Sequence, residues 1–168
     1  MYKHILLPTD GSALSEEAAR AGIELARRVG ARVTALHVLP EPNVLGIDGW
    51  THGDEDYARH LAKALERHGG LYVEAIRDEA RRAGVQCDAA LARGDSPEDE
   101  IIAQAQSRGC DLIVMASHGR KGSDGVLLAS VTLGVATLGH IPVLIHHGAR
   151  AKPAAGAGKR KQPAESGT

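Results

Sequence analysis

Residues 111–145, DLIVMASHGRKGSDGVLLASVTLGVATLGHIPVLI, decide the fold. The opening DLIVM is a short, unbroken apolar run led by one acid, which is typical of a parallel strand buried on both faces. A loop with glycines and two cations, Arg120 and Lys121, follows it. The uncharged VTLGVATL begins after Ser130 and stops at Gly139, and these two residues are suited to cap the ends of a helix. The stretch therefore predicts a strand, a glycine-containing loop, a helix and a last strand, IPVLI.

Such an arrangement can hold a phosphate group. The first amides of a helix are free, the helix dipole favours negative charge at that end, and small residues let the backbone come close. The spacing alone is a weak signal, because small residues also gather in ordinary turns between a strand and a helix. The phosphate hypothesis therefore needs support from another part of the chain.

The N-terminal residues supply that support. YKHILLPTDGS contains a second buried apolar strand, which ends at Pro8, Thr9 and Asp10 and opens onto a helix, and a further strand, ARVTALHVLPE, follows. Together with residues 111–145, these segments resemble the universal stress protein family, in order from about residue 1 to 147. Nucleotide-binding members of that family carry glycine, two residues, glycine, nine residues, then glycine followed by Ser or Thr.

This signature is intact in spacing, with alanine at two of its three glycine positions. Two residues separate Ala116 from Gly119, and nine more separate Gly119 from Ala129 and Ser130. If the backbone at position 129 needs a positive φ, alanine there costs about 1 kcal/mol or more. With a negative φ, the methyl group matters only if it points at the phosphate. Ala116 directly follows the strand, where an extended backbone is expected and alanine should fit.

The resemblance implies a fold, a ligand and a site. The fold is an α/β, Rossmann-like or flavodoxin-like three-layer sandwich with a five-stranded parallel sheet, of the adenine nucleotide alpha hydrolase kind. The expected ligand is ATP or a related adenine nucleotide, with Mg²⁺, at the carboxyl ends of the first and fourth strands. The residues at matching ligand positions are Pro8, Thr9, Asp10, Val38, Met115, Ala116, Gly119, Arg120, Ala129, Ser130 and Val131. Each also has an ordinary structural role open to it: a helix cap for Asp10, core packing for Val38 and Met115, and an exposed loop cation for Arg120.

The remaining chain alternates strands and helices. We expect strands at about 3–8, 32–39 and 85–92, an irregular loop at 41–56, and helices at about 13–29, 57–83 and 97–107, the last begun by Ser96 and Pro97. In the first helix, Ala18, Ala21, Leu25 and Val29 are spaced for one buried face. The second helix is expected to be weakest at Gly69–Gly70.

Composition excludes several classes of function. The 168 residues suit one domain and a tail, and the 2% aromatic content argues against a surface that stacks nucleic-acid bases. No apolar run approaches the roughly 20 residues of a membrane span, and no signal peptide is expected. Cys87 and Cys110 lie far apart and form no CxxC pair. They are expected to be buried thiols in a reducing compartment, which predicts a cytoplasmic protein.

The C-terminal residues differ in charge from the rest. After residue 148 the tail carries five cations against Glu165, a net charge of +4, so the body is near −5 because the whole chain is −1. Its Ala, Gly, Pro and Lys content predicts disorder. We therefore divide the chain into a universal stress protein domain at 1–147 and a disordered basic tail at 148–168. The tail is interpreted as solubilising, with weak contact to nucleic acid or to the acidic body as the alternative.

Candidate catalytic and metal-binding residues are few. Ser117 and His118 suggest a nucleophile and a base, but neighbours at a strand end usually point apart, so loop-stabilising hydrogen bonds are favoured. His37 is expected to be structural, and His146 and His147 should face opposite sides of a strand and make a poor metal pair. The chain has no Walker lysine motif, HxGH or SGGxDS segment. We expect no catalytic residue and no protein-bound metal site.

The last strand bears on assembly. IPVLI is expected at a sheet edge, where bare strand groups invite pairing, and the resemblance implies a homodimer through about residues 142–146. The uncharged helix before it is a further candidate for subunit contact. Three functions remain: a stress-response protein that binds an adenine nucleotide, an enzyme such as a weak ATPase or adenylyl transferase, and a family member without nucleotide that acts through protein clients not identifiable from the sequence.

Overall fold

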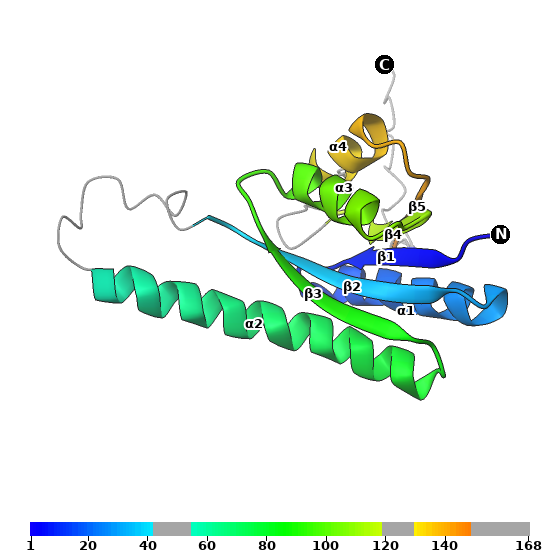
Figure 1. The fold of residues 1–168 in the computed structure, drawn as a ribbon, viewed down its shortest axis with the longest axis horizontal. Coiled ribbons are helices and arrows are strands. Elements are labelled where there is room, and N and C mark those ends of the chain that lie inside the picture. The colour runs from blue at the N-terminus through cyan, green and yellow to red at the C-terminus, as the bar shows by residue number, and fades with distance from the viewer. Residues whose placement is uncertain (42–54, 119–129, 149–168) are drawn as a thin grey trace, which may run out of the picture.

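The computed structural model describes residues 1–41, 55–118 and 130–148. Within these ranges, strands and helices alternate along the chain (Figure 1). The elements are β1 (His4–Pro8), α1 (Ala13–Val29), β2 (Arg32–Leu39), α2 (Glu55–Arg82), β3 (Cys87–Arg93), α3 (Pro97–Ser107), β4 (Leu112–Ala116), α4 (Ser130–Leu138) and β5 (Val143–His146). The expected loop at 41–56, apart from its ends, and the expected tail lie outside the described residues.

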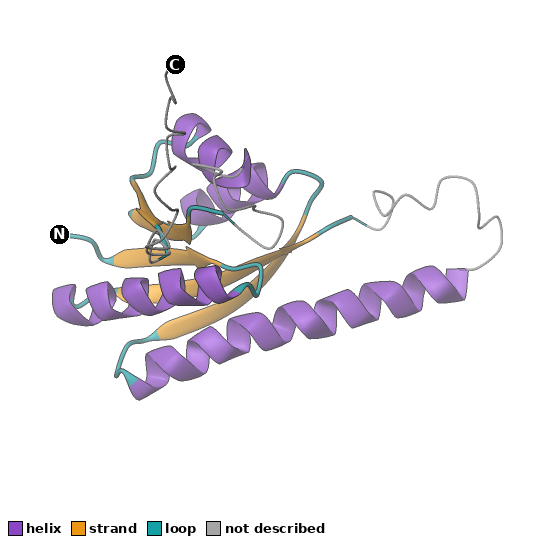
Figure 2. Cartoon of the chain, turned by 180° about the vertical axis from the view of Figure 1, so that it is seen from behind, coloured by secondary structure: helices purple, strands orange, loops and turns teal. Residues whose placement is uncertain are grey.

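The sheet is parallel with the strand order β3-β2-β1-β4-β5. The chain first builds outward from β1 to β2 and β3, then crosses over to β4 and β5 on the other side of β1. Helices α1 and α2 cover one face of the sheet, and α3 and α4 cover the other (Figure 2). The structure therefore confirms the three-layer α/β fold, and β5 lies at an edge as expected.

Alternate residues of each strand feed two separate cores. Ile5 and Leu7 of β1 pack with α1 and α2, whereas Leu6 packs with Leu36 and Ile113 on the α3 and α4 side. This follows from the two-residue period of a strand, and it explains why β1 and β4 are buried at every position and are apolar except for His4. Burying one Leu or Ile side chain completely contributes about 1.5–3 kcal/mol to the free energy of folding.

Helix α1 matches its expected range, and its expected buried face is confirmed in part. Ala18 is buried, and Leu25 and Val29 are half-buried against the core. The residues that face the sheet are Ser15, Ala18, Ala19, Gly22, Ile23 and Ala26. A Cβ added at Gly22 would collide with the side chain of Leu7, so the helix lies too close to the sheet for a larger residue there. At Gly22, small size decides which residue can face the sheet.

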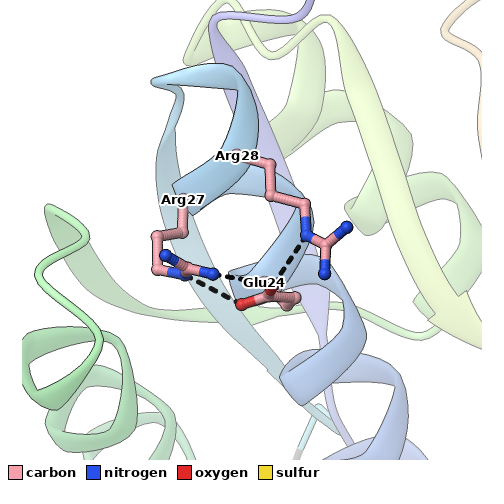
Figure 3. A network of polar contacts seen from close by, with 3 residues as sticks. All are labelled: Glu24, Arg27 and Arg28. Atoms are coloured by element: carbon pink, nitrogen blue, oxygen red, sulfur yellow. Dashed lines mark hydrogen bonds and ion pairs between the residues drawn. The ribbon is translucent and has the colours of Figure 1, made fainter.

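The ends of α1 follow capping chemistry. Ser12 accepts a hydrogen bond from the Ser15 amide at the first turn, and Gly30 ends the helix with φ 70°. On the exposed side, Glu24 accepts hydrogen bonds from Arg27 and Arg28 (Figure 3), and these bonds lower the pKa of Glu24 to about 2. Exposed ion pairs of this kind add little to stability.

Helix α2 runs unbroken through Gly69 and Gly70, so the expected weak point is absent. It begins two residues earlier than expected, and its N-terminal end extends beyond the sheet (Figure 1). Gly69 is buried where the helix packs on β2. Gly69 of this pair therefore marks a close approach of α2 to β2 and not a break in the helix.

The last elements differ slightly from their predicted ends. Ser130 is the first residue of α4 and not the residue before it, while Gly139 directly follows the helix and donates its N–H to the Val135 carbonyl at 3.2 Å. Strand β3 begins at Cys87, two residues later than expected. Among the described residues, no helix combines the length and the apolar character that crossing a membrane requires.

Candidate functional site

The candidate site lies where the strand order reverses. Strand β1 lies between β2 and β4, and the chain leaves β1 toward one side of the sheet and β4 toward the other. At such a point the two loops diverge, and open parallel sheets bind ligands in the crevice outside these carboxyl ends. The candidate site is therefore bounded by four segments: the turn after β1, the end of β2, the end of β4 and the start of α4.

The turn after β1 is held by its own side chains. The Thr9 amide donates to the Leu36 carbonyl at 2.8 Å, and the Thr9 hydroxyl accepts the Gly11 amide at 3.1 Å and lies 3.0 Å from the Ser15 hydroxyl. The Asp10 carboxylate accepts the Ser12 amide at 3.0 Å. Gly11 has φ 73°, a conformation that favours glycine. The turn is therefore fixed, with Thr9 buried and Asp10 half-buried.

The end of β2 is joined to this turn by His37. Its Nδ1 lies 2.7 Å from the Thr9 carbonyl oxygen, and because a carbonyl only accepts, Nδ1 carries the proton. The ring meets Tyr72 of α2 edge-on, with centroids 5.3 Å apart. These contacts support the structural role expected for His37. Val38, the next residue, is half-buried against the core that α3 and α4 cover.

The end of β4 is joined to the start of α4. The Thr132 hydroxyl donates to the Ala116 carbonyl at 2.9 Å, and Thr132 is 3% exposed. Met115 is buried in the core on the α3 and α4 side, against which Val131 and Val38 also pack. Three of the predicted ligand residues thus share one cluster, and Ser130 at the start of α4 is exposed. The first amides of that helix have no partner inside it.

Not all predicted ligand residues are placed. Pro8, Thr9, Asp10, Val38, Met115, Ala116, Ser130 and Val131 belong to the described parts of the chain, and Pro8 is buried at the end of β1. Gly119, Arg120 and Ala129 lie outside the described residues. Ala116 is the last residue of β4 and has no positive φ, so alanine fits there as expected. The strain argument therefore concerns Ala129 alone.

Ser117 and His118 contact each other, contrary to prediction. Ser117 Oγ and His118 Nδ1 are 3.1 Å apart, and Ser117 is 2% exposed. The alternation of side chains applies within a strand, and β4 ends at Ala116, so the two residues are free to face each other. The Ser117 amide also donates to the His146 carbonyl at 2.8 Å. The pair stabilises the start of the loop, the role that was favoured for it.

Other polar features lie outside the site. No group of three or more His, Cys, Asp or Glu residues that could hold a metal ion occurs in the described residues. His146 lies 3.6 Å from Glu17 of α1. A hollow of about 390 Å³ lies at the opposite, amino-terminal edge of the sheet, beside Lys3, Arg32 and Gly84. Because α1 and α2 both end there with their carbonyls, their dipoles disfavour an anion at that edge.

Sequence reasoning missed Thr132, Tyr72 and Gly69 as parts of the site's framework. For α2 a signal was present, since Gly69, Tyr72 and Val73 share a spacing of three and four residues with the buried positions that follow. That spacing places Gly69 on the buried face and Gly70 off it. Thr132 had no comparable signal, because its partner is a backbone carbonyl on another element.

Known proteins match this chain over most of its length. The model of the universal stress protein family matches residues 1–147. Universal stress protein MJ0531 of Methanocaldococcus jannaschii is 32% identical over 145 residues, which cover 86% of this chain and 82% of that protein. Universal stress protein YxiE of Bacillus subtilis is 31% identical over 147 residues, covering 86% of this chain and 99% of that protein.

A solved structure shows the same fold. The structure of MJ0577, also a universal stress protein of Methanocaldococcus jannaschii, superposes with a TM-score of 0.76 at 28% identity, covering 90% of this chain and 99% of that one. The residues matched by the family model include the five strands, the turn after β1 and the link between β4 and α4. The chain belongs to the universal stress protein family.

Proposed function

We propose that the protein is a cytoplasmic, homodimeric stress-response protein that binds ATP or a related adenine nucleotide, with Mg²⁺, and does not catalyse a reaction. The observation that carries the proposal is the reversal of strand order between β1 and β4, flanked by one turn fixed through Thr9 and one helix start fixed through Thr132. Universal stress proteins of this fold have been solved in complex with cAMP, with dAMP and with AMP, at 17% to 24% identity to this chain.

Each wall suits a different part of a nucleotide. At the adenine and ribose end, Asp10 supplies carboxylate oxygens and Val38 a backbone group beside an apolar side chain. At the phosphate end, the first amides of α4 at Ser130 and Val131 suit an anion. Gly119 and Arg120 are proposed to complete the phosphate site. Met115 is 6% exposed, so its contribution is expected through its backbone.

Magnesium fits the proposal through the nucleotide. Mg²⁺ usually binds through one or two carboxylates together with substrate phosphates. The described residues hold no cluster of three acidic, His or Cys groups that could bind a metal ion. We therefore expect the nucleotide phosphates to supply most of the magnesium ligands. Asp10 is the carboxylate at this edge among the predicted ligand residues. Bound magnesium would neutralise phosphate charge in the crevice.

A member without nucleotide remains the second candidate, and Ala129 is the observation that favours it. Calorimetric titration with Mg-ATP, with chromatography of nucleotide released on denaturation, separates the two. Binding without turnover supports the proposal, turnover supports a weak ATPase, and no binding supports action through protein clients. If the methyl group is the obstacle, Ala129→Gly strengthens binding while Ala116→Gly, at an extended position, leaves it unchanged.

The homodimer is proposed to form through β5. This strand lies at the sheet edge, and Leu144 is 41% exposed there, with Leu138 at the end of α4 63% exposed. An open edge strand beside exposed apolar residues invites pairing with a second copy. Leu144→Lys is expected to give monomers by light scattering at micromolar concentration. Leu71→Lys, at an exposed leucine on α2, is the control and leaves the dimer intact.

A further inference from the structure

One contact network joins α2 to the turn after β1. Thr9 and Asp10 lie on that turn, and α2 belongs to a different layer and a distant part of the sequence. We propose that His37 and Tyr72 are positioning residues through which the packing of α2 sets the turn, so that ligand affinity and α2 are coupled. The coupling rests on the proposed nucleotide function, whereas the positioning can be tested without any ligand.

The first link is between His37 and the turn. His37 Nδ1–H donates to the Thr9 carbonyl at 2.7 Å, and the Thr9 amide donates to the Leu36 carbonyl at 2.8 Å. Thr9 is 7% exposed, so its carbonyl depends on a protein partner for its hydrogen bond. The position of the His37 ring therefore constrains the backbone that leads directly into Asp10.

The second link is between Tyr72 and the turn. The Tyr72 ring meets the His37 ring edge-on at an interplanar angle of 78°. The same ring lies over Gly11, where an added Cβ would come within 2.5 Å of Tyr72 Cε1 and Cζ. Gly11 also donates its amide to the Thr9 hydroxyl. Tyr72 thus touches both the histidine that holds the turn and the turn itself.

The third link is the close approach of α2 to β2. A Cβ added at Gly69 would lie 2.5 Å from His37 Cδ2 and 3.2 Å from Leu39 Cδ2. A Cβ at Gly70 meets nothing within 4 Å. The glycine beneath His37 leaves no spare room, so any shift of α2 toward β2 must move the imidazole. The ring is held between Gly69 on one side and the Thr9 carbonyl on the other.

The proposal implies that ligand binding at the turn and the packing of α2 influence each other. If the turn adopts its binding geometry only when His37 is in place, then ligand on the turn favours this packing of α2, and this packing favours ligand. The N-terminal end of α2 extends beyond the sheet (Figure 2), so the element that senses the turn is also one that projects from the body. Positioning through α2 differs from simple core packing because it predicts an effect on the turn.

The adjacent glycines provide a matched pair of variants. Gly69→Ala and Gly70→Ala make the same chemical change at neighbouring positions of one helix, but only the first pushes on His37. In ligand-free protein, we expect Gly69→Ala to shift the backbone amide resonances of Gly11 and Ser12 in two-dimensional NMR, and Gly70→Ala to leave them in place. Unchanged turn resonances in a folded Gly69→Ala protein would overturn the proposal.

Affinity for Mg-ATP is the second readout. Gly69→Ala should weaken binding about tenfold, within the range of measured coupling between sites, and Gly70→Ala should change it less than about twofold. His37→Asn keeps a donor for the Thr9 carbonyl but removes the ring. In the His37→Asn background, Gly69→Ala should therefore weaken Mg-ATP binding no more than Gly70→Ala does. Equal weakening by both alanines, or no rescue by His37→Asn, contradicts the proposal.

Two further outcomes are informative. If Gly69→Ala does not fold, Tyr72→Leu replaces it, since loss of the ring over Gly11 should shift the same resonances, and a silent Tyr72→Leu would refute the positioning role. If the unmodified protein binds no nucleotide while Gly69→Ala still shifts the turn, the proposed function fails and the positioning stands. The NMR and affinity results therefore separate the two ideas.

Discussion

Replacing Thr132 with valine tests whether the start of α4 is fastened to the end of β4. The Thr132 hydroxyl donates to the Ala116 carbonyl at 2.9 Å across two elements, and the residue is 3% exposed. Valine has nearly the same shape, so the change removes the hydrogen bond without opening a large cavity. The buried carbonyl then loses a donor that water cannot easily replace.

The expected cost follows from that burial. A hydrogen bond whose removal leaves a buried partner unsatisfied costs about 1–3 kcal/mol in the free energy of unfolding. For a domain of this size, each kcal/mol lowers Tm by about 2–4 °C. Thr137→Val is the matched control on the same helix, because the Thr137 hydroxyl bonds the Leu133 carbonyl at 2.7 Å within the helix and is exposed. Its cost should stay within about 0.5 kcal/mol.

The assay is urea unfolding of both variants and the unmodified protein at one protein concentration, because the proposed dimerisation makes apparent stability depend on concentration. Thr132→Ser keeps the hydroxyl and should recover most of the loss. Equal and small losses for Thr132→Val and Thr137→Val would refute the reasoning, as would a Thr132→Ser protein no more stable than Thr132→Val. Either result would mean that the link does not hold the helix start.

Three further predictions concern stability. Burial lowers the pKa of His4 below its usual 6.5, so below that pH the unfolded state binds more protons than the folded state and the free energy of unfolding decreases as pH falls. His4→Gln should reduce this dependence of the free energy of unfolding on pH, measured by urea titrations at several pH values. An unchanged dependence would contradict the prediction. Gly30→Ala should lower the free energy of unfolding by about 1 kcal/mol because φ is 70°, since an added Cβ meets no other atom within 4 Å; Gly30→Asn should lower it less. Thermal melts in which both variants equal the unmodified protein would contradict this prediction. Glu24→Gln should change Tm little despite the low pKa of Glu24, since the ion pairs with Arg27 and Arg28 are exposed, and a large loss that persists at about 1 M salt would show the opposite.

Much of the fold could be predicted from the sequence because strong local signals and topology agree. The apolar runs within β1 and β4 identified them as central parallel strands, and the ranges of α1 and β2 were predicted to the residue. The edge position of β5 followed from the resemblance and is confirmed. These features depend on burial patterns that the sequence carries directly.

The errors arise where one element fits against another. The buried face of α1 was assigned from its apolar residues, which missed Gly22, where close approach to Leu7 requires a glycine. Gly69 was interpreted as a weak point because its local propensity is poor, whereas its role depends on His37 of another element. Ser117 and His118 were assigned opposite directions because the end of β4 was not known to the residue. These three features depend on contacts between different elements, which the local sequence pattern of one element does not reveal.

The two alanines of the signature show why the site was harder to predict than the fold. A glycine in a phosphate loop serves either the backbone conformation or the space beside the ligand, and sequence alone does not distinguish these roles. At Ala116 the backbone is extended, so the conformational role does not apply and alanine adds no strain. Its carbonyl is instead bonded by Thr132, which fastens β4 to α4 without requiring glycine. Of the two alanines, Ala129 is therefore the one whose methyl group bears on the proposed phosphate site, and Ala129→Gly measures how much that group matters.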